Sequence, residues 1–311
     1  MHELLTEAFV TSLLFGAITA SVPLLLAGLG EQISEKAGVL NIGIEGMMLL
    51  GAYGGFVAAY YSESFWLGFL AGGASGVLVA LLMALFCIWL SMNQIVIGIS
   101  LTVGVQGLTA LLHHFQFSRT YPRLSDSEAL AIPVVSKIPV IGEALFTRHP
   151  LVYLSVLLVL VMTWVFRRTY VGLNLQAAGD KPAALDAAGV SVTTTRVGAV
   201  LATGFLAGVG GAYLANVGAG LFIPFMTNGA GFICIVLAML ARGRPIWVLL
   251  GALLFGVSLA LTTALQVAGL NIPTDVVQML PFAMVIIVLI IFARHSYLPR
   301  ALGLPYIRGE R

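Results

Sequence analysis

Long apolar runs separated by short clusters of charge are the feature that most restricts the fold of this chain. Hydrophobic residues make up 59% of the sequence and charged residues only 9%, whereas a soluble domain carries about 25% charged residues. So little polar surface cannot cover an exterior that faces water. We therefore expect an all-α, polytopic membrane protein, folded as a single transmembrane domain over residues 1–311 and surrounded by membrane lipid.

Nine apolar segments have the length, or nearly the length, of a membrane-spanning helix, which needs about 20 residues. We expect about nine transmembrane helices, roughly eight to ten at the limits. The seventh segment is short, which predicts a half-helix joined to irregular backbone near residues 218–231. Such backbone is tolerated inside a membrane only where protein buries it or where it lines a cavity. The segments are residues 9–29, 40–61, 65–90, 95–115, 151–166, 197–217, 229–241, 246–268 and 276–293.

Basic residues gather at three places, and nine crossings would put all three on one side of the membrane. Lys and Arg in short loops mark the cytoplasmic side. We therefore expect residues 168–196 to form a cytoplasmic loop, residues 116–150 to form an extracellular loop, and the C-terminus to lie in the cytoplasm. The clusters are Arg167, Arg168, Lys181 and Arg196; Arg242 and Arg244; and Arg294, Arg300, Arg308 and Arg311.

Glycines four residues apart recur in the apolar segments. Gly51 and Gly55, Gly72 and Gly76, and Gly204 and Gly208 have this spacing. Small residues let membrane helices approach closely where lipid supplies no hydrophobic drive for association. Helix packing is therefore the first interpretation of these pairs.

Motifs for chemistry are absent from the sequence. No Gly-x-x-x-x-Gly-Lys-Ser/Thr run occurs, so the chain has no phosphate-binding loop for ATP. Neither His-Glu-x-x-His nor Cys-x-x-Cys is present, and no basic stripe indicates nucleic acid binding. We therefore expect no catalytic residue, no metal ligand and no cofactor in this chain, and we do not expect an enzyme.

Asn41 and Glu45 are polar residues at the start of the second apolar segment. Four residues apart, they would share one face of a helix. An ionisable group within a membrane span is a candidate for function, because burying it unpaired is costly. Two interpretations stay open: Glu45 pairs with Lys36 or caps a neighbouring helix, or the two side chains line a pathway or gate.

A short helix with clear start and stop signals is expected within the loop of residues 168–196. Asp180 is a favourable N-cap, Pro182 fits the first turn and Gly189 is a favourable stop. A helix of about two turns is marginal by itself in water, so we expect it to dock on another protein rather than lie on the bilayer. The predicted docking residues are Asp180, Lys181, Pro182, Ala183, Ala184, Leu185, Asp186, Ala187, Ala188 and Gly189.

These two segments resemble the permease subunits of bacterial ABC importers for nucleosides and simple sugars, in the wider family that includes branched-chain amino acid permeases. One is the run Gly38-Val-Leu-Asn-Ile-Gly-Ile-Glu-Gly-Met-Met-Leu-Leu-Gly-Ala-Tyr53. The other, from Gly172 to Gly189, is similar to the coupling loop of the wider family. The form of the first run favours nucleosides over simple sugars, with branched-chain amino acids third.

The resemblance implies a transporter in the bacterial inner membrane that works by alternating access. It implies three partners: an ABC ATPase subunit that binds ATP, a second and related permease chain, and an extracellular substrate-binding protein. A pathway for an uncharged polar solute needs hydrogen-bonding groups, although each candidate can instead bond between helices. Besides Glu45, the candidates are Asn41, Asn93, Gln94, Gln106, Asn216, Asn228, Gln266 and Gln278.

Two other functions stay open. An ion-coupled secondary carrier would depend on Glu45, and a membrane scaffold would move no solute. A carrier generally buries several ionisable groups at mid-depth, and the predicted spans contain Glu45 as their one clear example.

Overall fold

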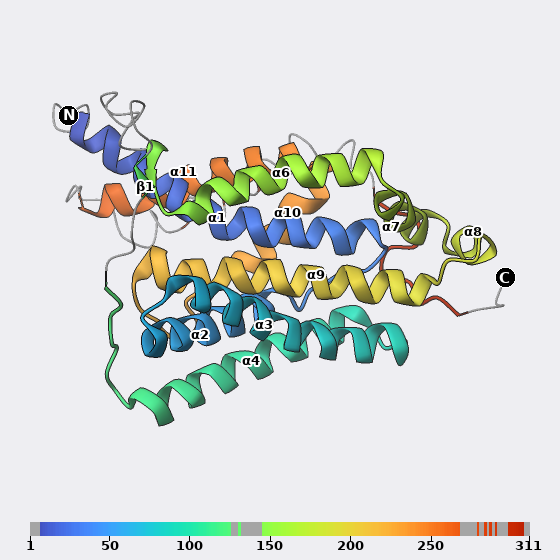
Figure 1. Cartoon of the computed structure of the whole chain (residues 1–311), viewed down its shortest axis with the longest axis horizontal. Coiled ribbons are helices and arrows are strands. Elements are labelled where there is room, and N and C mark those ends of the chain that lie inside the picture. Colours follow the sequence, from blue (N-terminus) through green and yellow to red (C-terminus); the bar gives the residue numbers. More distant parts are fainter. Residues whose placement is uncertain are drawn as a thin grey trace.

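The chain forms a bundle of long helices in the computed structural model (Figure 1), which describes residues 7–125, 130–131, 145–267 and 298–307 and a few positions between 279 and 290. Side chains 7–9 and 265–267 are outside this description. The elements are α1 (Glu7–Lys36), α2 (Ile44–Ser62), α3 (Phe65–Ala84), η2 (Leu85–Trp89), α4 (Gln94–Phe117), β1 (Leu130–Ala131), β2 (Thr147–Arg148), α6 (Pro150–Arg168), α7 (Tyr170–Asp180), α8 (Pro182–Ala187), α9 (Val192–Tyr213), η4 (Leu214–Ala219), α10 (Ala230–Ala241) and α11 (Pro245–Val267).

Six helices in the described part of the chain are long and apolar enough to cross a membrane, fewer than the expected number of about nine. Helix α10 has only 12 residues, so the predicted half-helix is present, and it follows the non-helical backbone that was expected there. Helix α2 has 19 residues but is not among the six, and much of it is buried within the bundle. The predicted ninth span lies almost entirely outside the described residues.

Glycines bring α2, α3 and α9 into direct backbone contact. A Cβ on Gly51 of α2 would overlap Gly208 of α9. On α3, a Cβ on Gly72 would lie 2.8 Å from the carbonyl oxygen of Gly51, and one on Gly76 would overlap the carbonyl oxygen of Gly204. The glycine pairs therefore pack helices, as their spacing predicts.

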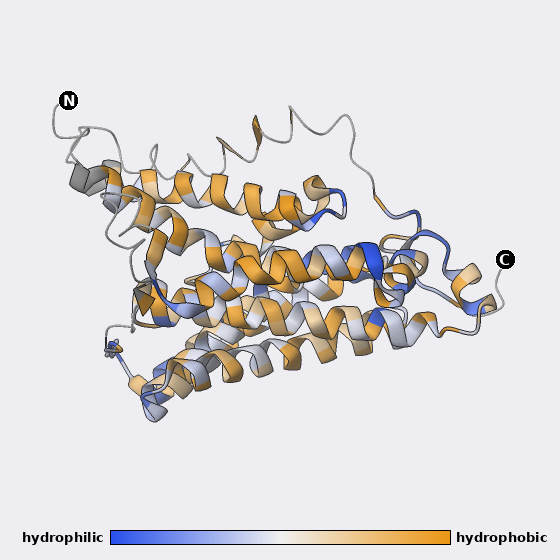
Figure 2. Ribbon diagram, turned by 45° about the horizontal axis from the view of Figure 1, so that its top comes forward, coloured by the Kyte–Doolittle hydropathy of each residue, from blue (hydrophilic) through white to orange (hydrophobic). Residues whose placement is uncertain are grey.

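Two ends of the bundle differ in character. At one end α1 finishes, α7 and α8 project, and the described C-terminal segment returns to the bundle (Figure 1). Polar residues are prominent at that end, while apolar residues follow the lengths of the helices (Figure 2). Lys36 also lies there, next to Gly243 in the turn that joins α10 to α11. Basic residues from the three clusters therefore meet at one end, which we call the basic end.

The opposite end holds the start of α6. His149 caps this helix by accepting a hydrogen bond at Nδ1 from Leu151 N, at 3.2 Å. Burial lowers the pKa of His149, and the lower pKa favours the neutral ring that this acceptor role requires. The two-residue strands β1 and β2 pair antiparallel nearby, with Leu130 opposite Arg148. Most of the predicted loop 116–150 lies outside the described residues.

The glycine contacts predict a position-specific cost of adding one methyl group. Gly76→Ala should destabilise the bundle by about 1–3 kcal/mol, the usual range for overpacking, because the backbone of α9 cannot move aside. Thermal unfolding in detergent, followed by size-exclusion chromatography, measures this loss. Gly107→Ala on α4 is the matched control, since a Cβ there meets nothing within 4 Å. Equal loss in both variants would contradict the packing role.

Candidate functional site

Glu45 lies inside the bundle, where two helices begin. Its Oε1 accepts hydrogen bonds from Thr227 Oγ1 at 2.6 Å and from Gly229 N at 2.9 Å. Its Oε2 accepts one from Gly231 N at 2.6 Å. The side chain is 1% exposed, so protein groups rather than water satisfy this carboxylate.

Helix geometry explains why a carboxylate belongs at this position. The first amides of a helix have no partner within the helix, and its N-terminus carries partial positive charge. Glu45 is in the first turn of α2 and also binds the first amides of α10. Gly231 permits the close approach, because a Cβ there would lie 2.6 Å from the Cα of Glu45. The expected alternative of a cap on a neighbouring helix is therefore confirmed, whereas a role in a pathway stays a prediction.

Asn41 does not share a helical face with Glu45, and that expectation was wrong. Helix α2 begins at Ile44, so Asn41 belongs to the connector of residues 37–43 between α1 and α2. Its backbone N donates to Glu31 Oε1 at 3.2 Å, and its Nδ2 approaches the sulfur of Met47 at 3.4 Å. Its Oδ1 is buried and has no partner in the described part of the chain.

The sequence analysis missed three buried residues of α1 that carry carboxyl or amide side chains. The first span was expected to end at residue 29, but α1 continues to Lys36. Glu31 and Gln32 are each 1% exposed and Glu35 is 5% exposed. The sequence held a signal, because no proline or turn motif follows Gly30 and the two glutamates are four residues apart. Glu45 is therefore not the only carboxylate buried among these helices.

The other predicted pathway residues are dispersed. Gln94 is buried and accepts at Oε1 from Leu40 N at 2.8 Å, so it binds the connector 37–43 to which Asn41 belongs. Asn93 caps α4 through Ile95 N and Val96 N. The remaining candidates lie elsewhere: Asn216 donates to Gly55 O at 3.3 Å, Gln106 is half-buried on α4, Asn228 is exposed, and the Gln266 side chain and Gln278 lie outside the described residues.

The short helix α8 differs from the sequence expectation at its start. Its N-cap is Lys181, with no side-chain cap, because Asp180 is the last residue of α7. Pro182 forces Lys181 out of helical geometry, and this separates the two helices. Pro182 occupies the first turn and Gly189 has φ +83°, so these two predictions are confirmed. Leu185 is buried, whereas the surrounding alanines are mostly exposed.

Arg196 joins three segments at the basic end. Its Nε donates to Ala37 O at 3.1 Å, its Nη1 to Leu304 O at 2.8 Å and its Nη2 to Ala178 O at 3.3 Å. The guanidinium thus links the connector 37–43, the C-terminal segment and α7.

Backbone hydrogen bonds join the same three segments. Ala301 N donates to Gly179 O at 2.8 Å, and Gly303 N donates to Gly38 O at 3.0 Å. Helix α7 is therefore bonded to the connector through the C-terminal segment as well as through Arg196.

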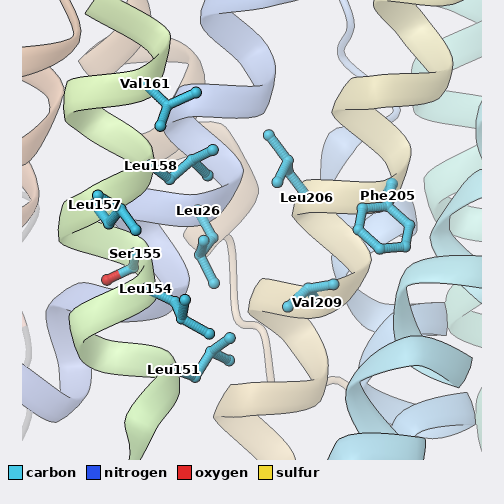
Figure 3. Close-up of a pocket in the computed structure, with 10 residues that line it drawn as sticks. All are labelled: Leu26, Leu151, Leu154, Ser155, Leu157, Leu158, Val161, Phe205, Leu206 and Val209. Carbon is cyan, nitrogen blue, oxygen red and sulfur yellow. The ribbon is translucent and has the colours of Figure 1, made fainter.

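Cavities of the described structure include an apolar groove of about 310 Å³ among α1, α6 and α9 (Figure 3). Nine of its ten lining residues are apolar, and the hydroxyl of the tenth, Ser155, already donates to Val152 O at 2.7 Å. This groove offers little to a polar solute.

A second cavity of about 370 Å³ is lined by Thr227 and Asn228, among others, and so borders the Glu45 cap.

The fold and these contacts define a multi-pass helical membrane protein with a projecting, stabilised helix pair at one end. Residues 13–289 match the family described as the permease component of the branched-chain amino acid transport system. The chain therefore belongs to this family of transport permeases, and the resemblance inferred from the two motifs is confirmed.

Three relatives have high similarity to this chain. It is 33% identical to the nucleoside ABC transporter permease NupC of Lactococcus lactis, over 93% of this chain and 95% of the relative. It is 30% identical to the guanosine ABC transporter permease NupQ of Bacillus subtilis, over 94% and 95%. It is 40% identical to TsgC13, a candidate glucose ABC transporter permease of Haloferax volcanii, over 80% and 76%. Lactococcus lactis NupB, a second nucleoside permease, matches at 25%.

The Glu45 cap predicts a loss of stability in a conservative variant. Glu45→Gln keeps the shape of the side chain but replaces one acceptor oxygen with an amide nitrogen. At least one of the three donors then loses its partner, which should cost about 1–3 kcal/mol. Thermal unfolding in detergent measures this loss.

The matched control for this variant is Glu63→Gln, at the exposed end of the same helix. If Glu45→Gln unfolds at the same temperature as the control, Glu45 does not stabilise the start of α10.

Proposed function

We propose that this chain is the transmembrane permease subunit of an ATP-driven ABC importer for nucleosides, and that it works by alternating access. The observation that carries the proposal is the similarity to NupC and NupQ over nearly the whole chain. ATP is bound and hydrolysed by a separate ATPase subunit, in keeping with the absence of a phosphate-binding loop from the sequence.

A simple-sugar importer is the second candidate. TsgC13 has the higher identity of 40%, although over a shorter part of this chain. Hexoses and nucleosides are both uncharged and rich in hydroxyl groups. A pathway that recognises them needs hydrogen bonds rather than net charge, and this requirement is common to both candidates.

The ATPase docks on α8 in this proposal. Leu185 anchors α8 to Ala178 and Val192, while Ala183, Ala184 and Ala187 are exposed. Alanine side chains let a groove of the partner approach the helix backbone closely. The basic end then lies in the cytoplasm, as basic short loops indicate, and the C-terminus lies there too.

The remaining partners follow the general arrangement of such importers. A second, related permease chain completes the pathway, and an extracellular substrate-binding protein approaches the end of the bundle that holds His149. The proposal places the assembly in the cytoplasmic membrane of a bacterium. Lactococcus lactis has two nucleoside permeases that are similar to this chain, NupB and NupC, and this supports a pair of different permease chains.

Uptake by the complete transporter tests the proposal. We expect proteoliposomes that contain both permeases, the ATPase and the binding protein to accumulate guanosine only when ATP reaches the ATPase. ATP-dependent accumulation of glucose, without accumulation of guanosine, would favour the second candidate. Uptake by this chain alone, without ATP, would contradict both.

A crosslinking experiment tests the docking surface. Ala187→Cys should form a crosslink to a single cysteine in the ATPase groove, because Ala187 is exposed on α8. Glu63→Cys at the other end of the bundle is the control and should give none. The two native cysteines, Cys87 and Cys234, are buried and free, so their background reaction is small. No crosslink at Ala187 or its exposed neighbours would exclude α8 as the docking helix.

Arg196→Gln should uncouple the transporter. Loss of the guanidinium removes charged hydrogen bonds, each worth about 1.5–3 kcal/mol, that join α7 to the connector 37–43. We expect ATP hydrolysis to continue while uptake per ATP falls roughly tenfold. Arg168→Gln, an exposed arginine at the same end, is the control. Unchanged uptake per ATP in Arg196→Gln would show that the connector receives no motion through this side chain.

A further inference from the structure

Five buried polar atoms near the connector 37–43 have no hydrogen-bond partner in the described structure. They are Glu31 Oε2, Gln32 Oε1, Gln32 Nε2, Glu35 Oε2 and Asn41 Oδ1. Leaving such groups unsatisfied costs about 1–3 kcal/mol each, and native proteins contain few of them. Five atoms on four residues therefore call for a physical explanation.

The three residues of α1 lie on one face of the helix. Gly28, Glu31, Gln32 and Glu35 follow the spacing of helical neighbours. A Cβ on Gly28 would contact Val248 of α11 and Leu237 of α10, which shows where this face points. Glu31 also accepts the hydrogen bond from Asn41 N. Glu31, Gln32 and Glu35 thus lie on the face of α1 that meets α10 and α11, and Asn41 of the connector contacts Glu31. We call Glu31, Gln32, Glu35 and Asn41 the α1 polar cluster.

The cluster is closed off from all surfaces of this chain. Its residues are at most 5% exposed, so neither lipid nor a second permease chain reaches them in this conformation. The described structure supplies no partner for these atoms, and a molecule that enters when the conformation changes would supply one. The connector lies beside these atoms, and its displacement would expose them. Residues 37–43 form no regular helix and are bonded to α7 through Arg196.

The chemistry of the cluster selects the kind of molecule. Glutamate carboxylates accept hydrogen bonds and, when ionised, donate none, while a glutamine amide does both. In the described part of the chain, no three His, Cys, Asp or Glu residues form a group that could hold a metal ion. Paired hydroxyl groups on neighbouring carbons match this set, since they donate to carboxylates and exchange hydrogen bonds with amides.

We propose that Glu31, Gln32, Glu35 and Asn41 form a hydroxyl-recognition site for a polyhydroxylated solute, exposed when the connector moves. The inference rests on the proposed transport function and names the part of the solute that this chain contacts. A ribose and a hexose both carry adjacent hydroxyl groups. The site could therefore bind either a nucleoside or a simple sugar, and the experiment below distinguishes the two.

Selectivity, rather than rate, is the decisive measurement. ATP-driven uptake by the complete transporter is compared for guanosine and 2′,3′-dideoxyguanosine, and separately for glucose and 2-deoxyglucose. The preference is the ratio of the uptake of the hydroxylated solute to that of its deoxy analogue. For the pair that the wild-type transporter moves, we expect Glu31→Gln and Gln32→Leu each to lower this ratio about fivefold, the effect of one hydrogen bond. If the wild-type transporter distinguishes the two members of the first pair, its solute is a nucleoside. If it distinguishes those of the second pair, its solute is a sugar.

The controls separate this inference from the proposed function. Glu63→Gln, exposed and far from the cluster in sequence, should keep the wild-type preference. Glu35→Gln supplies another test if one variant fails to fold in detergent. Variants that slow both members of a pair equally would overturn the hydroxyl site and leave the transport function standing. A wild-type transporter that moves none of the four solutes with ATP would overturn the proposed function itself.

Discussion

One carboxylate fixes the start of the short helix α10 inside this bundle. Glu45 begins α2 and binds the first amides of α10 through Gly229 and Gly231. Helix α10 has 12 residues and follows a stretch without regular helix. Its orphan amides would be costly inside a membrane, because no water reaches them. The position of α10, and of the neighbouring turn with Thr227 and Asn228, therefore depends on a single buried charge whose field is favourable to two helix N-termini at once.

The bundle divides into a tightly packed part and a part with unsatisfied contacts. Helices α2, α3 and α9 meet through glycine backbones that leave no room for one extra methyl group, so they pack as one tight unit. The connector 37–43 instead borders polar atoms without partners and is held mainly by hydrogen bonds from Arg196 and the C-terminal segment. Polar atoms without partners raise the free energy of this conformation relative to a second one. A transporter that alternates between two conformations needs such a small free-energy difference between them.

Sequence reasoning reached the features that depend on local chemistry. Apolar length located α3, α4, α6, α9, α10 and α11 to within about five residues. Glycine spacing predicted the packing of α2, α3 and α9, and Gly189 stopped α8 as expected. It failed where tertiary contacts decide. Burial of Glu31 and Glu35 against the connector allowed α1 to continue past Gly30, and the return of the chain into the bundle kept Asn41 out of α2. Asp180 was misread as a cap because the helix that ends there, α7, was not foreseen.

The connector 37–43 is bonded both to the segments beside α8 and to the α1 polar cluster. At one of its ends, Ala37 and Gly38 are bonded to Arg196 and to the C-terminal segment, and through them to α7 beside α8. Near its other end, Asn41 contacts Glu31, and Leu40 is held by Gln94. In the proposed mechanism, a movement that begins at α8 would pass through Arg196 and the C-terminal segment to the backbone beside the buried polar atoms. Chemical energy spent on a partner would then change the exposure of these atoms without any charge in this chain having to cross the membrane.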